Sequence, residues 1–148
     1  MPDYDVVELT AAETHPLRLA VLRADTPNRI VTFAEDDWPG TVHLGVLHAG
    51  AIVAISTWIP RPHHDENAVQ LRGMATAPQM QGQGVGAILL EAGCEQATKV
   101  AHVVWARARD AALNFYLRHG FAIEGDGFID EQTQKPHHLI VRRLTSSG

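Results

Sequence analysis

Apolar and polar positions alternate along several short stretches of this chain. The clearest stretch is 68–76, in which Val69 and Leu71 alternate with Gln70 and Arg72 before Pro78 ends the run. Alternation of this kind is typical of a β-strand with one buried face. Further alternating or continuous apolar runs predict strands at 5–9, 42–47, 51–59, 101–106, 121–124 and 139–144.

Two glycine-containing stretches are expected to reverse the chain between strands. Residues 48–50 join two of the predicted strands, and Gly50 permits the tight turn that an antiparallel pair needs. The stretch Gly125-Asp126-Gly127 is expected to turn the chain after the strand that begins at Phe121.

Helical spacing replaces alternation in three other segments. Thr10 and Glu13 have the spacing of a capping box, so we expect the first helix to start there, with Pro16 in its first turn. The expected buried stripe of this helix is Leu17, Ala20 and Val21. A second helix runs from Val85 to about Lys99, and a third is capped by Asp110 and ended by Gly120.

Between the strand at 68–76 and the second helix lies the glycine-rich run Gln81-Gly82-Gln83-Gly84-Val85-Gly86. The first turn of a helix leaves backbone N–H groups without partners and carries partial positive charge. Glycines allow phosphate oxygens to approach that backbone closely. The pattern therefore favours a phosphate or pyrophosphate site over a plain glycine turn.

Three classes of phosphate-bearing ligand use such a loop. A nucleoside triphosphate loop ends in Gly-Lys-Ser/Thr, whereas this one ends Gly86-Ala87-Ile88. Gly82, Gly84 and Ala87 satisfy the dinucleotide pattern G-x-G-x-x-G/A formally. That fingerprint also requires a carboxylate at the end of the next strand, which here runs into Arg107. Coenzyme A is the third class.

The loop resembles the acyl-CoA-binding motif of the GNAT superfamily of N-acetyltransferases. Gln81, Gly84 and Gly86 fit the pattern Gln/Arg-x-x-Gly-x-Gly/Ala, with Gln in place of the commoner Arg. A second match follows in the family's order, an A-x-x-F-Y-x-x-x-G-F ending formed by Ala112, Phe115, Tyr116, Gly120 and Phe121. The resemblance covers at least residues 42–144. It implies an α/β (α+β) fold with a mixed, mostly antiparallel sheet, splayed at the cofactor site and carrying helices on both faces.

The same resemblance implies acetyl-CoA as co-substrate. In that fold the pantetheine arm lies along the strand edge at Met74, Ala75 and Thr76, with a main-chain N–H near Met74 facing the thioester oxygen. The pyrophosphate is held by backbone amides of Gln81, Gly82, Gln83, Gly84, Val85, Gly86 and Ala87. Many members of the family carry Asn at the position that Arg109 occupies in this chain. Two alternatives remain for Arg109 and its neighbour Arg107: they reach the phosphates of coenzyme A, or they lie on the surface and keep the protein soluble.

By the same resemblance, an amine of a small molecule or peptide attacks the thioester directly in a ternary complex. Tyr116 stands where the family places its general acid, whereas periodicity alone favours a core aromatic residue. The candidates for the general base are Glu35, Asp36, His137 and His138. A catalytically silent acyl-CoA-binding module, acting as a sensor or partner domain, is the alternative.

Composition and length restrict the kinds of partner, compartment and cross-link expected for this chain. A net charge of -5 argues against nucleic acid as a partner. The length fits one domain over residues 1–148, and neither a membrane segment nor a secretory signal is recognisable, so we expect a cytoplasmic monomer or homodimer. The single cysteine, Cys94, excludes an intramolecular disulfide and is expected in the core.

Two polar clusters remain. Glu35, Asp36 and Asp37 are interpreted as a solvated loop, with a wall that attracts the acceptor amine as the alternative. The run from His63 to Glu66 offers four metal-ligating side chains, but neighbours in sequence rarely converge on one ion. We therefore expect another solvated loop there and no metal.

Overall fold

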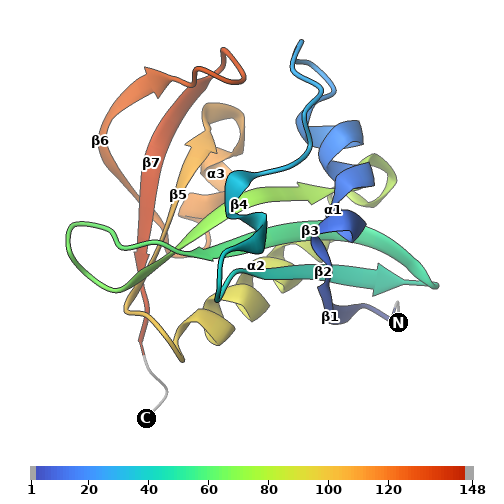
Figure 1. The fold of residues 1–148 in the computed structure, drawn as a ribbon, viewed down its shortest axis with the longest axis horizontal. Coiled ribbons are helices and arrows are strands. Elements are labelled where there is room, and N and C mark those ends of the chain that lie inside the picture. Colours follow the sequence, from blue (N-terminus) through green and yellow to red (C-terminus); the bar gives the residue numbers. More distant parts are fainter. Residues whose placement is uncertain (1–2, 146–148) are drawn as a thin grey trace.

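The computed structural model describes residues 3–145, in which seven strands form one sheet of order β1-β2-β3-β4-β5-β7-β6 (Figure 1). Every neighbouring pair is antiparallel except β4 and β5, which run parallel. The strands are β1 (Asp5–Leu9), β2 (Val42–His48), β3 (Ala51–Pro60), β4 (Ala68–Thr76), β5 (Val103–Arg109), β6 (Ala122–Ile129) and β7 (Pro136–Arg143). The predicted mixed, mostly antiparallel sheet is confirmed.

Helical segments cover both faces of this sheet, as expected. They are α1 (Ala11–Leu17), η1 (Arg18–Leu22), η2 (Ala34–Asp37), η3 (Pro78–Met80), α2 (Val85–Ala97), η4 (Asp110–Ala112) and α3 (Leu113–Leu117). Successive strand residues point to opposite faces. Ile55 of β3 accordingly packs in the cluster beneath α1, whereas its neighbour Ala54 packs in the main core with Leu89 of α2. Cys94 lies in that main core, as predicted.

The two parallel strands part from each other along their carboxyl-terminal halves. β4 and β5 pair only from Ala68 to Gln70, opposite Val103 to Trp105. On its other side, β4 carries a bulge: Ala75 faces Ile55 and Arg72 faces Thr57, so that Gly73 and Met74 both oppose Ser56. Gly73 has φ +65, which glycine adopts without strain. The sheet is therefore splayed at the end of β4 that leads into the glycine loop.

The amino-terminal helix begins as predicted and continues differently. Thr10 and Glu13 form the capping box, in which each backbone nitrogen lies 2.8 or 3.2 Å from the side-chain oxygen of the other residue. Pro16 lies in the second turn of α1, not in the first, and cannot donate a hydrogen bond there. The next turn, η1, is a π-helix, and its wider turn does not keep the 3.6-residue stripe. Ala20 is exposed as a result, and Arg18 is buried instead.

The last hairpin also differs from the prediction. Gly125 to Gly127 do not turn the chain but form a bulge inside β6, opposite His138 of β7. The chain turns after Asp130, whose carboxylate accepts hydrogen bonds from the backbone N–H groups of Gln132 and Thr133. β7 therefore starts at Pro136 rather than at Leu139. A glycine-rich pattern fits a bulge as well as a turn, because both use positive φ angles.

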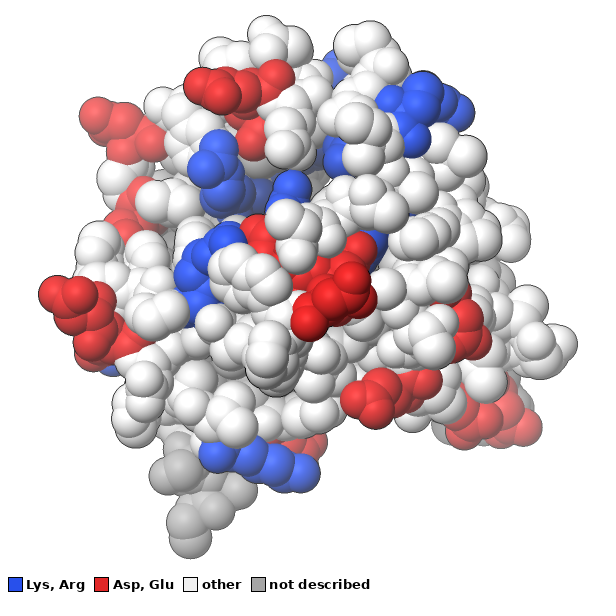
Figure 2. All heavy atoms as spheres, in the orientation of Figure 1, with Lys and Arg blue, Asp and Glu red and all other residues white. Residues whose placement is uncertain are grey.

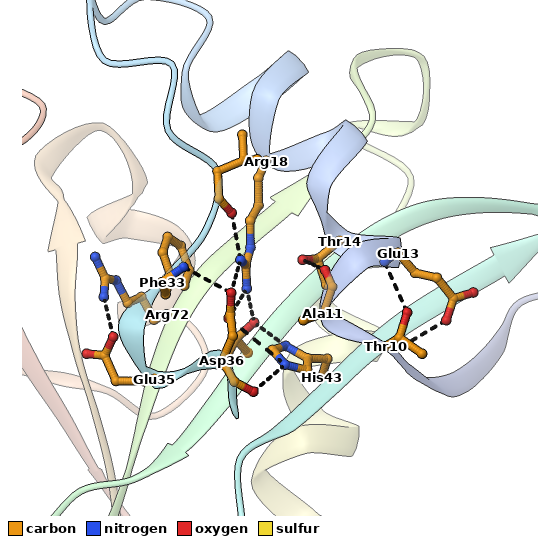
Figure 3. Close-up of polar contacts among 12 residues, drawn as sticks. Thr10, Ala11, Glu13, Thr14, Arg18, Phe33, Glu35, Asp36, His43 and Arg72 are labelled. Atoms are coloured by element: carbon orange, nitrogen blue, oxygen red, sulfur yellow. Dashed lines mark hydrogen bonds and ion pairs between the residues drawn. The ribbon is translucent and has the colours of Figure 1, made fainter. Parts of the chain in front are cut away.

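A buried ion pair ties the amino-terminal segment to the sheet (Figure 3). The terminal nitrogens of Arg18, whose side chain is 1% exposed, each lie 2.9 Å from a carboxylate oxygen of Asp36. Arg18 also donates to the carbonyl of Val31 and to the hydroxyl of Thr57, both at 2.8 Å. Burial alone would raise the pKa of Asp36, but hydrogen bonds from Arg18 and Phe33 outweigh it and hold that pKa below its usual value.

The interpretation of the acidic cluster as a solvated loop was therefore wrong for Glu35 and Asp36, although Asp37 is exposed. Glu35 is buried between the guanidinium groups of Arg61 and Arg72, at 2.9 and 3.1 Å. The cations that neutralise Glu35 and Asp36 come from distant parts of the chain, and local sequence gives no sign of them.

No helix within residues 3–145 combines the length and the apolar character needed to cross a bilayer.

Replacing Arg18 with Met should lower the free energy of unfolding by about 3–5 kcal/mol, because Asp36 keeps a buried charge without its partner. Urea denaturation at pH 7 measures the change. The control is Arg143→Met, which removes an arginine whose side chain is 70% exposed and which pairs with Glu66. We expect less than about 1 kcal/mol there.

The same pair predicts a pH dependence. The lowered pKa of Asp36 contributes stability above the unfolded pKa of about 4, and this stability is lost as the pH falls through the folded pKa. Arg18→Met should weaken that acid dependence. Equal losses in Arg18→Met and Arg143→Met would contradict the importance of the pair.

Candidate active site

A cavity of about 730 Å³ lies in the splay between β4 and β5. Its walls come from both strands, from the segment between η1 and η2, from α3, and from the β6–β7 turn. Figure 2 shows basic side chains, Lys or Arg, next to acidic side chains on one face of the molecule. Met74 and Tyr116 both line the cavity, so the structure brings together two of the predicted site residues.

Tyr116 projects from α3 toward β4. Its hydroxyl lies 3.8 Å from the sulfur of Met74, and its ring packs edge-on against Phe121 and Phe115. A thioether is a weak acceptor, so this contact does not satisfy the hydroxyl as a core hydrogen bond would. Burial raises the pKa of Tyr116 to about 12. The phenol is therefore protonated at neutral pH and has a proton to donate.

The glycine loop leads directly from the end of β4 into α2. Gly82 and Gly84 have φ +80 and +84, and no atom outside their chain neighbours lies within 4 Å of a Cβ built at either position. No side chain caps α2, and its first helical bond is donated by Ile88 to the carbonyl of Gly84, at 3.2 Å. Within the described residues, the backbone N–H groups from Gly82 to Ala87 donate no hydrogen bond, so they are available to an anion.

The remaining predicted cofactor residues lie around this loop, with one exception. Ala75 and Thr76 pair with β3 and adjoin the splay, and the Gln81 amide nitrogen donates to the Thr76 carbonyl at 3.1 Å. Arg109 instead donates to the Leu22 carbonyl at 2.8 Å and lies 3.4 Å from Asp25. It lines the cavity, whereas residues 81–87 do not.

The four candidate bases have different surroundings. Glu35 and His137 line the cavity, and Asp36 does not. Burial would raise the pKa of Glu35, but a backbone hydrogen bond and the two arginines outweigh it, so the pKa lies below the usual value. His137 has one ring nitrogen 2.9 Å from the Lys135 carbonyl. His138 lies outside the cavity lining and contacts Asp110 at 2.6 Å.

Several residues of the cavity wall were missed by sequence reasoning. Arg23, Arg72 and Asp130 line it from three separate segments. Arg72 occupies a polar position of the predicted β4, and Asp130 follows β6, but nothing in the local pattern distinguishes them from ordinary surface residues. Only the contacts between these segments identify them.

The loop at His63 is only partly solvated, because the side chain of His63 is mostly covered whereas that of His64 is exposed. The Nε2 atoms of His63 and His64 lie 2.8 and 2.7 Å from the same carboxylate oxygen of Glu124, and the His63 ring stacks on Trp105. The nitrogen and oxygen atoms of His63, His64 and Glu124 that could bind a metal lie within 4.8 Å of one another. These two neighbouring histidines thus do converge, contrary to the expectation from their adjacency. At 2.7 and 2.8 Å, imidazole N–H groups satisfy the carboxylate directly. The absence of a metal remains a prediction.

Comparison with known proteins decides the family. A family model described as "Acetyltransferase (GNAT) family" matches residues 7–121. The chain belongs to that family. It is accordingly an acyltransferase of the N-acetyltransferase class. Neither a dinucleotide-binding protein nor the catalytically silent acyl-CoA-binding module is favoured.

Individual relatives are distant. The chain is 27% identical over 128 residues to the "Uncharacterized N-acetyltransferase YitI" of Bacillus subtilis, covering 84% of this chain and 86% of that protein. Among solved structures, Escherichia coli ElaA has a TM-score of 0.77 at 19% identity, covering 96% of this chain and 99% of its own. An acyl-CoA N-acyltransferase from Pseudomonas aeruginosa has a TM-score of 0.77 at 20% identity and the same coverage. The structural likeness confirms the predicted GNAT fold.

The environment of Tyr116 predicts an alkaline titration. The difference in tyrosinate absorbance between wild type and Tyr116→Phe should have its midpoint near pH 12, because burial disfavours the phenolate. Tyr4→Phe, which removes the other tyrosine, is the control. A Tyr116 midpoint near pH 10 would show that the hydroxyl is solvated.

Proposed function

We propose that this protein transfers the acetyl group of acetyl-CoA to a primary amine of a small molecule or peptide in a ternary complex. The observation that carries this proposal is the contact between Tyr116 and Met74 at the splay, directly before the glycine loop. A protonated phenol there is close to where the family resemblance puts the thioester. The open glycine loop supplies the second half of the site.

Cofactor binding would use the backbone more than side chains. The pantetheine arm would lie in the splay along Met74, Ala75 and Thr76, where β5 no longer pairs with β4. The amides of residues 81–87 would hold the pyrophosphate at the start of α2. A role for Arg109 in phosphate binding remains a prediction, and its contacts with Leu22 and Asp25 favour the acceptor side.

In the reaction, the free amine attacks the thioester carbon and charge develops on the carbonyl oxygen. A backbone N–H near Met74 would stabilise that charge. A base takes one proton from the attacking nitrogen, the carbonyl re-forms and the carbon–sulfur bond breaks. The leaving thiolate takes the hydroxyl proton of Tyr116, which solvent later restores. Glu35 and His137 are the two base candidates that line the cavity. Glu35 already forms ion pairs with two arginines. Within the described residues His137 forms none, so His137 is the better candidate for the base.

Binding of acetyl-CoA should raise the melting temperature by a few degrees. Saturation at about 100 times the dissociation constant adds about 2.7 kcal/mol to stability. Gly84→Val should abolish the shift, since a side chain would enter the anion site and strain the backbone by about 1–3 kcal/mol. Gly50→Val is the matched control, because Gly50 has φ +79 and equally open surroundings in the β2–β3 turn.

The assignment of the loop fails if both valine variants keep the shift or both lose it. A shift with NAD and none with acetyl-CoA or free coenzyme A would overturn the proposed cofactor.

Tyr116→Phe should lower kcat by about 10²–10⁴-fold on an acceptor that releases free thiol, if proton transfer limits turnover. The KM for acetyl-CoA should change little, because the hydroxyl is not expected to bind the cofactor. Tyr4→Phe serves as the control and should retain wild-type kcat. Unchanged turnover in Tyr116→Phe would show that another group, or water, protonates the thiolate.

A further inference from the structure

Arg23 lies in the cavity wall, and only part of its guanidinium group is hydrogen-bonded. The residue is 7% exposed. The Nε atom donates to the carbonyl of Ile30 at 2.8 Å. Within residues 3–145, its two terminal nitrogens make no hydrogen bond or ion pair. These nitrogens are therefore free to bind an anion that enters the cavity.

Two of the three carboxylates that line the cavity already pair with other arginines. Five arginines line the cavity, namely Arg23, Arg61, Arg72, Arg107 and Arg109, against three carboxylates, Glu35, Asp130 and Glu131. Glu35 pairs with Arg61 and Arg72, and Asp130 pairs with Arg107. The wall is therefore positive, although the chain as a whole has a net charge of -5.

The arginines also repel one another. Burial lowers the pKa of Arg23, and the charges of Arg109 and Arg18 lower it further, while Asp130 acts in the opposite direction. Burial likewise lowers the pKa of Arg72; Glu35 opposes this effect, and Arg23 adds to it. An anion bound between these groups would relieve the repulsion.

We propose that the acceptor carries an anionic group, a carboxylate or a phosphate, and that Arg23 binds it with Arg72 and Arg109. The amine of the same molecule would then face Met74 and Tyr116 across the cavity. A guanidinium offers paired N–H donors that match either anion. Coenzyme A is not the expected source of the anion, because no residue of the 81–87 loop lines this cavity. The inference rests on the proposed function.

Pairs of amines that differ only in the anionic group provide the test. Lysine and cadaverine, tyrosine and tyramine, and glucosamine 6-phosphate and glucosamine are compared by thiol release from acetyl-CoA. We expect the anionic member of a pair to have at least a tenfold higher kcat/KM. Whether the preferred pairs carry carboxylate or phosphate distinguishes the two sources of the anion.

Variants link that preference to Arg23. Arg23→Gln should reduce it about 10- to 100-fold, mainly through KM for the amine, the factor typical of a lost hydrogen bond to a charged group. Arg23→Lys should retain part of the preference. Arg143→Gln, which removes an exposed arginine paired with Glu66, should leave it unchanged. The KM for acetyl-CoA should stay the same in all three, and thermal melting checks their folding.

Calorimetric binding of the same amines to the protein saturated with coenzyme A gives a readout without turnover. Preferred binding of anionic members without thiol release would refute the proposed function and keep the inference. Equal transfer to both members of each pair would support the proposed function and refute the inference of an anionic acceptor. If Arg23→Gln does not fold, the test uses the preference for anionic amines measured with Arg23→Lys and with the wild-type protein. The inference is overturned if neither assay shows the preference, or if folded Arg23→Gln weakens both members equally.

Discussion

The buried pair between Arg18 and Asp36 fixes the segments that stand above the sheet. It joins η1 to η2 and, through Thr57, anchors both on β3. The guanidinium of Arg18 also lies 3.8 Å from the centre of the Phe33 ring, and Arg72 lies 4.0 Å from the same ring. The Arg18–Asp36 pair thus positions Phe33 and Glu35 above the sheet. Both of these residues line the cavity.

The sheet supplies the opposite constraint. The bulge at Gly73 brings the backbone of β4 beneath Phe33, so close that a Cβ at Gly73 would lie 2.8 Å from the ring. The same bulge displaces Met74 toward Tyr116 at the point where β5 leaves β4. The Arg18–Asp36 pair, the ring of Phe33 and the bulge at Gly73 therefore lie in contact, one above the other. A change in any of them would alter the distance between the acceptor cavity and the glycine loop.

Local patterns in the sequence predicted the local parts of this arrangement. The strands, the Thr10–Glu13 cap and the strand–glycine loop–helix unit depend on neighbours in the chain, and the two family motifs fixed the fold. What could not be predicted depends on distant partners. Glu35 meets Arg61 and Arg72, and His63 meets Glu124, across 26 to 61 residues of chain. Similarly, a glycine-rich run such as Gly125 to Gly127 does not reveal whether it will form a turn or a bulge until the register of its partner strand is known.

The charged groups of the cavity wall lie outside the glycine loop. Arg23 follows η1, Asp130 and Glu131 lie in the β6–β7 turn, and the other charged groups come from η2, β4, β5 and the residue that follows β3, whereas the loop is the junction of β4 and α2. Substitutions at Arg23 or around Asp130 can therefore change which molecules enter without touching the backbone amides at the start of α2. This division lets acceptor choice diverge during evolution while the cofactor half of the protein is maintained.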